Sequence, residues 1–127
     1  MLSSSKVTTI LPVKDMDRAR NFYEKSLGLT PAGPLEDGTC LFSDDGHHGI
    51  QLMLKPEGSP SGNTELSFEV EDITAELKVL ESNGVRFEDY DLPGLKTVDH
   101  VAESDGQKAA WFTDTEGNIL CLHQIAG

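Results

Sequence analysis

The sequence predicts an α+β domain of two tandem βαβββ modules that form cupped mixed β-sheets. A Val-x-Asp pattern opens two stretches of helical spacing, at Val13 and at Val70, and each stretch ends at a glycine. Each unit then closes on an apolar strand that follows a further glycine, at Gly49 and at Gly117. Because a tandem of similar half-domains tends to place one site between the halves, we expect the functional site at their junction.

The first module spans about residues 6–55. β-branched residues over 7–13 predict a strand, and Asp15 is a suitable N-cap for a helix that Gly28 ends. Proline and glycine residues then divide the chain into three short antiparallel strands, near 31–36, 39–43 and 49–55. A linker rich in proline, glycine and serine follows at 56–63.

The second module spans about residues 64–125 and repeats this order. Residues 64–71 alternate between apolar and polar side chains, and Asp72 caps a helix that ends at Gly84. Further strands are predicted near 85–90, 107–113 and 118–124. The segment 91–105 is predicted to be a long loop, and because long loops inside compact domains are often functional, it is a candidate lid.

Composition indicates a single domain over residues 1–127 and excludes two classes of partner. The net charge of −12 would repel phosphate backbones and anionic lipids, so we expect neither nucleic acid nor membrane as a partner. No apolar run approaches the roughly 20 residues that span a bilayer. The first residues do not resemble a secretory signal, and Cys40 and Cys121 form no disulfide framework, so a cytoplasmic location is expected.

Several short motifs, in their order along the chain, resemble a known family. They are Val-x-Asp before each helix, Asn21-Phe22-Tyr23 followed by Leu27-Gly28-Leu29, and Trp111-Phe112-x-Asp114-x-x-Gly117-Asn118. Together with the repeat they resemble the vicinal oxygen chelate superfamily, which includes glyoxalase I, bleomycin-resistance-type binding proteins, fosfomycin-resistance enzymes and extradiol dioxygenases. The resemblance covers essentially the whole chain and implies that fold. Many relatives pair two chains, so it also implies a homodimer.

The resemblance implies a test for a metal site. Enzymes of this family hold a divalent metal with one residue from each of four strands, and the matching positions here are Thr8, Gln51, Glu65 and Cys121. A threonine hydroxyl is a poor ligand, and a cysteine thiolate mixes poorly with hard oxygen donors. We therefore expect no metal and no other cofactor. The alternative is a reduced divalent-metal site of Gln51, Glu65 and His123.

Strand alternation, considered without the family, selects an inner face of mixed polarity, as in a ligand-filled concavity. The residues predicted to bind a ligand are Thr8, Gln51, Met53, Glu65, Trp111, Cys121 and His123. A polar interface surface is the alternative interpretation of this face. Trp111 suits either ligand stacking or core packing, whereas Cys121 is more typical of a small buried hydrophobe than of a nucleophile.

Glu65 is the candidate catalytic residue. In a cup lined by Ile10, Met53 and Trp111 it is placed as a general base for a proton next to a carbonyl group. An exposed strand carboxylate is the alternative. The histidines outside the inner face are less informative. His47 and His48 are predicted to be an exposed turn pair, and His100 is either a residue of the lid or solvated.

Two functions follow from these observations. The first is binding of a small organic molecule in the cup without metal, as in bleomycin-resistance-type proteins. The second is a metal-dependent lyase, isomerase or dioxygenase that resembles glyoxalase, with Glu65 as ligand or general base. The expected partners are a small organic molecule and a second copy of the chain.

Overall fold

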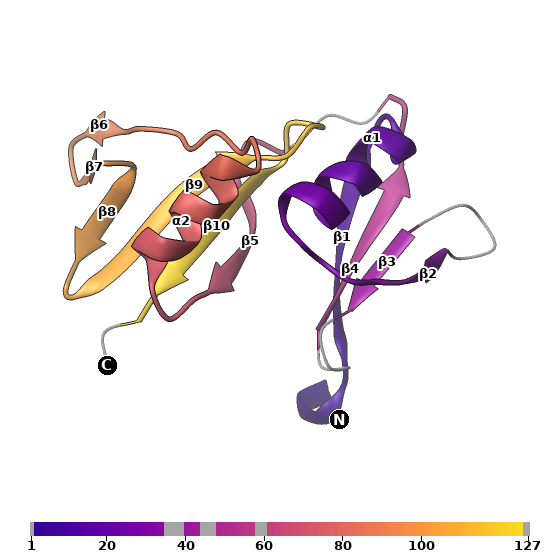
Figure 1. The fold of residues 1–127 in the computed structure, drawn as a ribbon. Helices are drawn as coiled ribbons and strands as arrows, with labels where there is room; N and C mark the ends of the chain where they lie inside the picture. The colour runs from indigo at the N-terminus through magenta and orange to yellow at the C-terminus, as the bar shows by residue number, and fades with distance from the viewer. Residues whose placement is uncertain (1, 35–39, 44–47, 58–60, 126–127) are drawn as a thin grey trace.

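The computed structural model describes residues 2–34, 40–43, 48–57 and 61–125 and shows two sheets, each with one helix on one face (Figure 1). In the first module a 3-10 turn, η1 (Leu2–Ser4), precedes the strands, which run in the order β1-β4-β3-β2. Their bounds are β1 Val7–Val13, β2 Pro31–Pro34, β3 Cys40–Ser43 and β4 His48–Leu54. The helix α1 (Met16–Asn21) continues into a π-helical turn, η2 (Phe22–Ser26).

The second module has its own sheet, in the order β5-β10-β9-β8-β7-β6. The strands are β5 Thr64–Glu69, β6 Asp91–Leu92, β7 Leu95–Val98, β8 Val101–Ser104, β9 Gln107–Thr113 and β10 Ile119–Gln124, and the helix is α2 Ile73–Ser82. The first strand of each module pairs in parallel with its last, β1 with β4 and β5 with β10. This shared topology confirms the repeat that the sequence predicted.

Local capping explains where both helices begin. The side chains of Asp15 and Asp72 accept hydrogen bonds from the backbone N–H groups of Arg18 and Ala75, at 3.0 and 3.1 Å. Each aspartate thereby satisfies one N–H group that the first helical turn leaves without a partner. Gly84, which follows α2, has a φ of 94°, a conformation that side chains disfavour.

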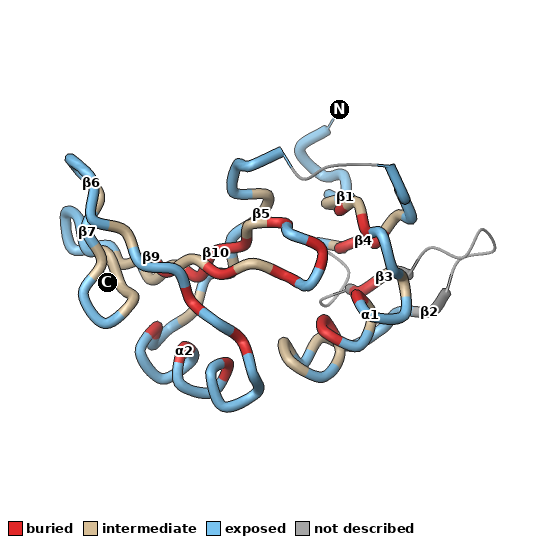
Figure 2. Tube along the Cα trace, turned by 90° about the horizontal axis from the view of Figure 1, so that it is seen from above, coloured by how far each residue is buried: buried red, intermediate tan, exposed pale blue. Residues whose placement is uncertain are grey.

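The core lies between each sheet and its helix, as the burial colours of Figure 2 show. Leu11 and Leu52 of the first sheet and Leu120 and Phe112 of the second are fully buried, and Tyr23 from η2 joins them. Among the described elements, no helix lies against the opposite face of either sheet (Figure 1).

Two predictions for the second module are wrong. Residues 85–90 contribute only an isolated bridge, Phe87 with Phe112, although Val85 and Phe87 are buried. Residues 91–105 are not a loop, because β6, β7 and β8 pair in sequence and extend the sheet to six strands where four were expected. Within the described parts of the chain, no helix combines the length and apolar character needed to cross a membrane.

Candidate functional site

The uncovered face of the second sheet brings several predicted residues together. Leu120 and Leu122 point toward α2 and are buried, so Cys121 and His123 between and beyond them point to the other face. In the strand register Cys121 lies opposite Ser67 of β5 and opposite Trp111 of β9. We name this surface, made of Ser67, Glu69, Tyr90, Trp111, Cys121 and His123, the open face.

A polar chain crosses the open face from β5 to β10. The Ser67 hydroxyl lies 2.5 Å from Nδ1 of His123, and Nε2 of the same ring lies 3.6 Å from Oε1 of Glu69. The imidazole ring therefore joins a hydroxyl on one side to a carboxylate on the other. The three side chains can therefore present polar groups to a ligand.

An aromatic pair flanks this chain. The rings of Trp111 and Tyr90 meet edge to face, with centroids 5.5 Å apart and planes at 90°. Burial raises the pKa of Tyr90, and the nearby charge of Glu88 raises it further, so its hydroxyl stays a neutral donor. Trp111 and His123 line one hollow of about 390 Å³ that reaches toward Leu95.

Cys121 contributes shape to the open face rather than reactivity. Its side chain is buried, as predicted, and burial raises the pKa of its thiol. The Sγ donates a hydrogen bond to the backbone oxygen of Leu122 at 3.1 Å. Because the thiolate is the nucleophilic form, a thiol with a raised pKa is a poor nucleophile and a poor metal ligand.

The first sheet carries the other predicted residues on its own uncovered face. In the register of β1 and β4, Gln51 lies opposite Ile10, and Met53 lies opposite Pro12. Thr8 is exposed on the same face, and Ile10 is 51% exposed. This surface presents apolar and neutral polar groups, and it lies on a different sheet from Trp111, Cys121 and His123.

Glu65 lies at the seam between the modules, on the same strand as Ser67 and Glu69 of the open face. It lines a cleft of about 580 Å³ together with Thr9 and His48 of the first sheet. Thr8 and Gln51 belong to the same two strands, β1 and β4, but lie on the opposite face of that sheet. Its carboxylate accepts a hydrogen bond from the Ser61 hydroxyl. The general-base role proposed for Glu65 on sequence grounds stays a prediction.

The four positions that match the family's metal ligands do not fit a divalent cation. Cys121 holds its proton, Thr8 offers a neutral hydroxyl, and the Glu65 carboxylate already accepts from Ser61. Across the described residues, no three side chains from His, Cys, Asp or Glu gather as a metal site would require. In the alternative set with Gln51, His123 already contacts Ser67 and Glu69.

The two other histidines that the structure describes, His48 and His100, lie away from the open face. His48 is exposed, with Nε2 3.0 Å from the Thr9 hydroxyl oxygen, and His47 lies outside the described residues. His100 contacts Asp89 at 2.9 Å and Glu81 of α2 at 3.6 Å, which places it on the helix side of the sheet. It does not reach over the open face, and the lid interpretation is wrong.

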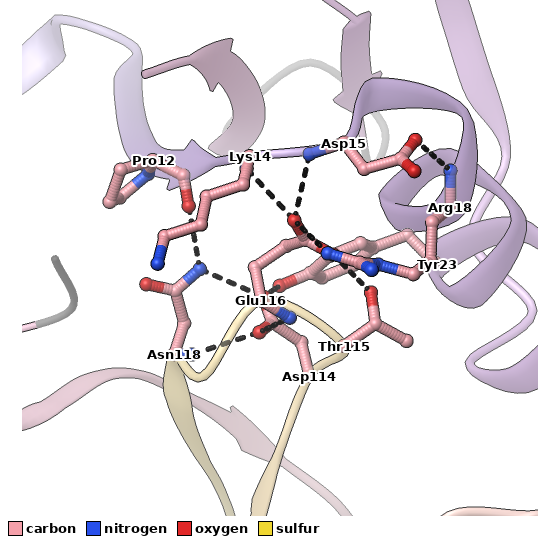
Figure 3. Close-up of polar contacts among 9 residues, drawn as sticks. All are labelled: Pro12, Lys14, Asp15, Arg18, Tyr23, Asp114, Thr115, Glu116 and Asn118. Atoms are coloured by element: carbon pink, nitrogen blue, oxygen red, sulfur yellow. Dashed lines mark hydrogen bonds and ion pairs between the residues drawn. The ribbon is translucent and has the colours of Figure 1, made fainter. Parts of the chain in front are cut away.

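A polar junction between the modules was not predicted (Figure 3). Oε1 of Glu116 accepts from the backbone N–H groups of Lys14 and Asp15 at 2.8 and 2.9 Å, and Oε2 accepts from Nε of Arg18 at 2.8 Å. Although burial alone would raise the pKa of Glu116, these bonds and that of Thr115 lower it to about 2. The turn between β9 and β10 is thereby fixed to the start of α1.

The same turn reaches further into the first module. The Tyr23 hydroxyl donates to Oδ2 of Asp114 at 2.6 Å, and the Asn118 amide donates to the backbone oxygen of Pro12 at 3.0 Å. Burial, and then the charge of Asp114, raise the pKa of Tyr23, so it remains a donor. Asp114 and Asn118 belong to the motif from Trp111 to Asn118 that resembles the family. This motif was the sequence signal available for the junction.

The paired modules, each a sheet with one helix on one face, define the class: a glyoxalase-type α+β protein. The chain belongs to the Glyoxalase/Bleomycin resistance protein/Dioxygenase superfamily, whose family model matches residues 6–122. No curated protein matches the chain.

Solved structures share the fold over nearly the whole chain. TnmS3, an antibiotic binding protein from Streptomyces sp. CB03234, is 22% identical with a TM-score of 0.74, and the match covers 98% of each chain. A glyoxalase family protein from Bacillus anthracis is 20% identical with a TM-score of 0.72, covering 98% of this chain and 95% of the other. A glyoxalase/bleomycin resistance protein from Streptomyces sp. CB03234 is 22% identical with a TM-score of 0.69, covering 94% and 100%.

Proposed function

We propose that the protein binds a small aromatic organic molecule on the open face of its second sheet. The observation that carries this proposal is the Trp111–Tyr90 pair, which lies beside the hydrogen-bonded chain of Ser67, His123 and Glu69. Ligand sites combine apolar surface with a few placed polar groups, and this surface does so on a sheet face without a helix.

Binding is favoured over metal-dependent chemistry by the donor set described above. An inert thiol at Cys121 and a neutral hydroxyl at Thr8 replace the hard ligands that family enzymes use. TnmS3, which shares the fold, is an antibiotic binding protein, and an organic ligand of that kind suits the present surface. We also expect the protein to act in the cytoplasm.

The proposal includes a second copy of the chain. The open face is shallow, and the first sheet presents an uncovered face of its own in which Ile10 is 51% exposed. If the first sheet of one copy covers the open face of another, both surfaces are removed from contact with water. A ligand that lies between the two copies is then enclosed. The predicted residues Thr8, Gln51 and Met53 would then face the ligand from the partner.

Trp111 provides the test, because the chain contains one tryptophan. Aromatic compounds should change the fluorescence of Trp111 as they bind, and isothermal calorimetry should give the same affinity. His123→Ala should weaken binding by about tenfold through loss of the placed hydrogen bonds. His100→Ala, on the helix side, is the matched control. Equal affinities for the two variants, or no binder in a broad aromatic set, would contradict the proposal.

Proton transfer is a second candidate function, favoured by the short Ser67–His123 contact and the carboxylate of Glu69 behind the ring. His123 would take the proton next to a carbonyl group of the bound molecule, the role that sequence reasoning gave to Glu65. The measurement is loss of deuterium from the carbon next to a carbonyl in a ligand found by the fluorescence test. Exchange that persists unchanged in His123→Gln would exclude this role.

A further inference from the structure

We propose that the groove between α2 and the β7–β8 hairpin is a second binding site, which takes an organic anion with a short aliphatic body. The groove lies on the helix side of the second sheet and has a volume of about 730 Å³, within the range of small-molecule sites. None of the residues that define the open face lines it. The site therefore differs from the one in the proposed function.

The groove forms because one helix covers only part of a six-stranded sheet. The helix α2 packs against β9 and β10, and β7 and β8 extend the sheet beyond it (Figure 1). On this extension Val98 is 66% exposed, although its cross-strand neighbour Val101 packs against the core. The α2 residues Leu77, Lys78 and Glu81 form the facing wall. An aliphatic group placed between these walls loses contact with water, which favours its binding.

One end of the groove carries a row of charges across three strands. Glu103 of β8 pairs with Lys108 of β9. On the other side of β8, Thr97 pairs with Ala102, and continuing this register by one residue places Lys96 beside Glu103. Side chains in one cross-strand row project from the same face of a sheet. Two lysines therefore flank one carboxylate at this end.

Lys78 of α2 adds a third ammonium group, so Lys78, Lys96 and Lys108 line the groove from three different elements. Within the described parts of the chain, none of the three takes part in an ion pair. They are three of the ten lysines and arginines in a chain of net charge −12. The groove therefore gathers positive charge on an acidic protein, and an anionic group can form charge-assisted hydrogen bonds there.

The acidic residues other than Glu103 lie toward the opposite end. Asp99 and His100 form the tip of the hairpin, and Nε2 of His100 lies 3.6 Å from Oε2 of Glu81. Lys96 lies two residues before Val98 on β7, which is about 7 Å further from the tip. The anionic group of a ligand should therefore bind at the lysine end, with its aliphatic body over Val98.

A matched series tests this site: hexyl phosphate, hexanol and hexylamine, which are an anion, a neutral molecule and a cation on one aliphatic body. Because they have no aromatic ring, they do not suit the Trp111–Tyr90 pair of the open face. Titration followed by two-dimensional NMR should show that hexyl phosphate binds more tightly than hexanol or hexylamine. It should shift the amide resonances of Leu77, Val98 and Val101. Higher ionic strength should weaken its binding.

The variant Lys78→Gln removes one positive charge from the groove. Lys78 is the suitable position, because Lys96, Glu103 and Lys108 also border the hollow of about 390 Å³ beside Trp111, whereas Lys78 does not. We expect hexyl phosphate to bind about fivefold more weakly, with little change for hexanol. The matched control is Lys55→Gln, which changes an exposed lysine after β4 that lies outside the groove. Circular dichroism checks that both variants fold.

Three results would overturn the inference. Equal binding of hexyl phosphate and hexanol would show that the lysines do not recognise the anion. An equal loss in Lys55→Gln and Lys78→Gln would show that net charge alone decides the affinity. Resonance shifts confined to Trp111 and His123 would place the ligand on the open face instead. His123→Ala should leave the binding of hexyl phosphate unchanged, so failure of the proposed function on the open face does not affect this result.

Discussion

Buried charges persist in folded proteins where hydrogen bonds replace the water that they lose. The turn between β9 and β10 illustrates this at the level of single residues. Glu116 is buried and accepts hydrogen bonds from two backbone N–H groups and from Arg18, whose side chain is 51% exposed. Asp114 is buried and accepts from Tyr23 and Asn118. Each carboxylate therefore stabilises the junction between the modules.

Replacing Tyr23 by phenylalanine tests the contribution of one bond in this junction. The change leaves the buried ring in place and removes the hydroxyl that donates to Asp114 at 2.6 Å. The free energy of unfolding should fall by about 1–3 kcal/mol, because a buried carboxylate oxygen loses a donor. Urea unfolding measures the change. Tyr90→Phe is the control, since no hydrogen bond of the Tyr90 hydroxyl occurs among the described residues, and it should change stability by less than about 0.5 kcal/mol.

The lowered pKa of Glu116 predicts that the free energy of unfolding decreases in acid. Its pKa is about 2 in the folded protein against an ordinary value of 4.5, so the unfolded chain binds the proton first as the pH falls. The stabilisation is fully present above pH 4.5 and is lost as the pH falls through about 2. Urea unfolding should therefore show that the difference in the free energy of unfolding between the wild type and Glu116→Gln becomes smaller as the pH falls across this interval. A difference of constant size would contradict the assignment.

Residue roles were predictable where the partner is near in sequence. Asp15 and Asp72 cap helices that begin at the next residues, and their types and positions indicated this. Glu116 and Lys14 are 102 positions apart, so no local pattern joins them. The contact of Tyr90 with Trp111 was not predictable for a similar reason. It depends on how the segment that contains Tyr90, which is not a strand, crosses the sheet.

The hairpin of β7 and β8 is the element that differs most from the sequence prediction. Its turn residues Asp99 and His100 have φ values of 51° and 72°, which a tight two-residue turn requires and which glycine or asparagine commonly supplies. Because the turn contains neither, the segment resembled a loop. His100 also binds the turn to Asp89 and Glu81, and these contacts compensate for the unfavourable backbone conformation.

Asp99 offers a test of this element. A β-branched residue tolerates positive φ poorly, so Asp99→Val should destabilise the hairpin by about 1–2 kcal/mol. Amide hydrogen exchange should accelerate at Val98 and Val101 while β10 stays protected. Asp99→Asn accepts the same backbone conformation and should leave exchange unchanged. Equal exchange in the two variants would show that the turn is not what holds the hairpin.

At the scale of the whole molecule, the repeat and the motif order were sufficient to predict the family and the two modules. The placement of side chains between modules was not predictable from the same patterns. Glu65, for example, lines a cleft with Thr9 and His48 of the first sheet. Contacts between the modules, such as those of Asp114 and Glu116, join residues far apart in the sequence, and strand periodicity does not indicate them.

Two opposing contributions, apolar surface and net charge, act on the proposed association of two chains. Apolar surface around Ile10, which is 51% exposed, favours association. A charge of −12 on each copy opposes it through repulsion that salt screens, with a Debye length of about 8 Å at physiological ionic strength.

These contributions predict a dimer that salt strengthens. Light scattering should give twice the chain mass of 13.8 kDa, and sedimentation should show a dissociation constant that falls as sodium chloride is added. Ile10→Glu should yield monomers, because it places a further charge in the apolar contact. Val79→Glu is the matched control: Val79 is 55% exposed on α2, away from the uncovered sheet faces, and its substitution should leave the dimer intact. A dimer that salt dissociates would mean that ionic contacts hold the copies together and that another surface forms the interface.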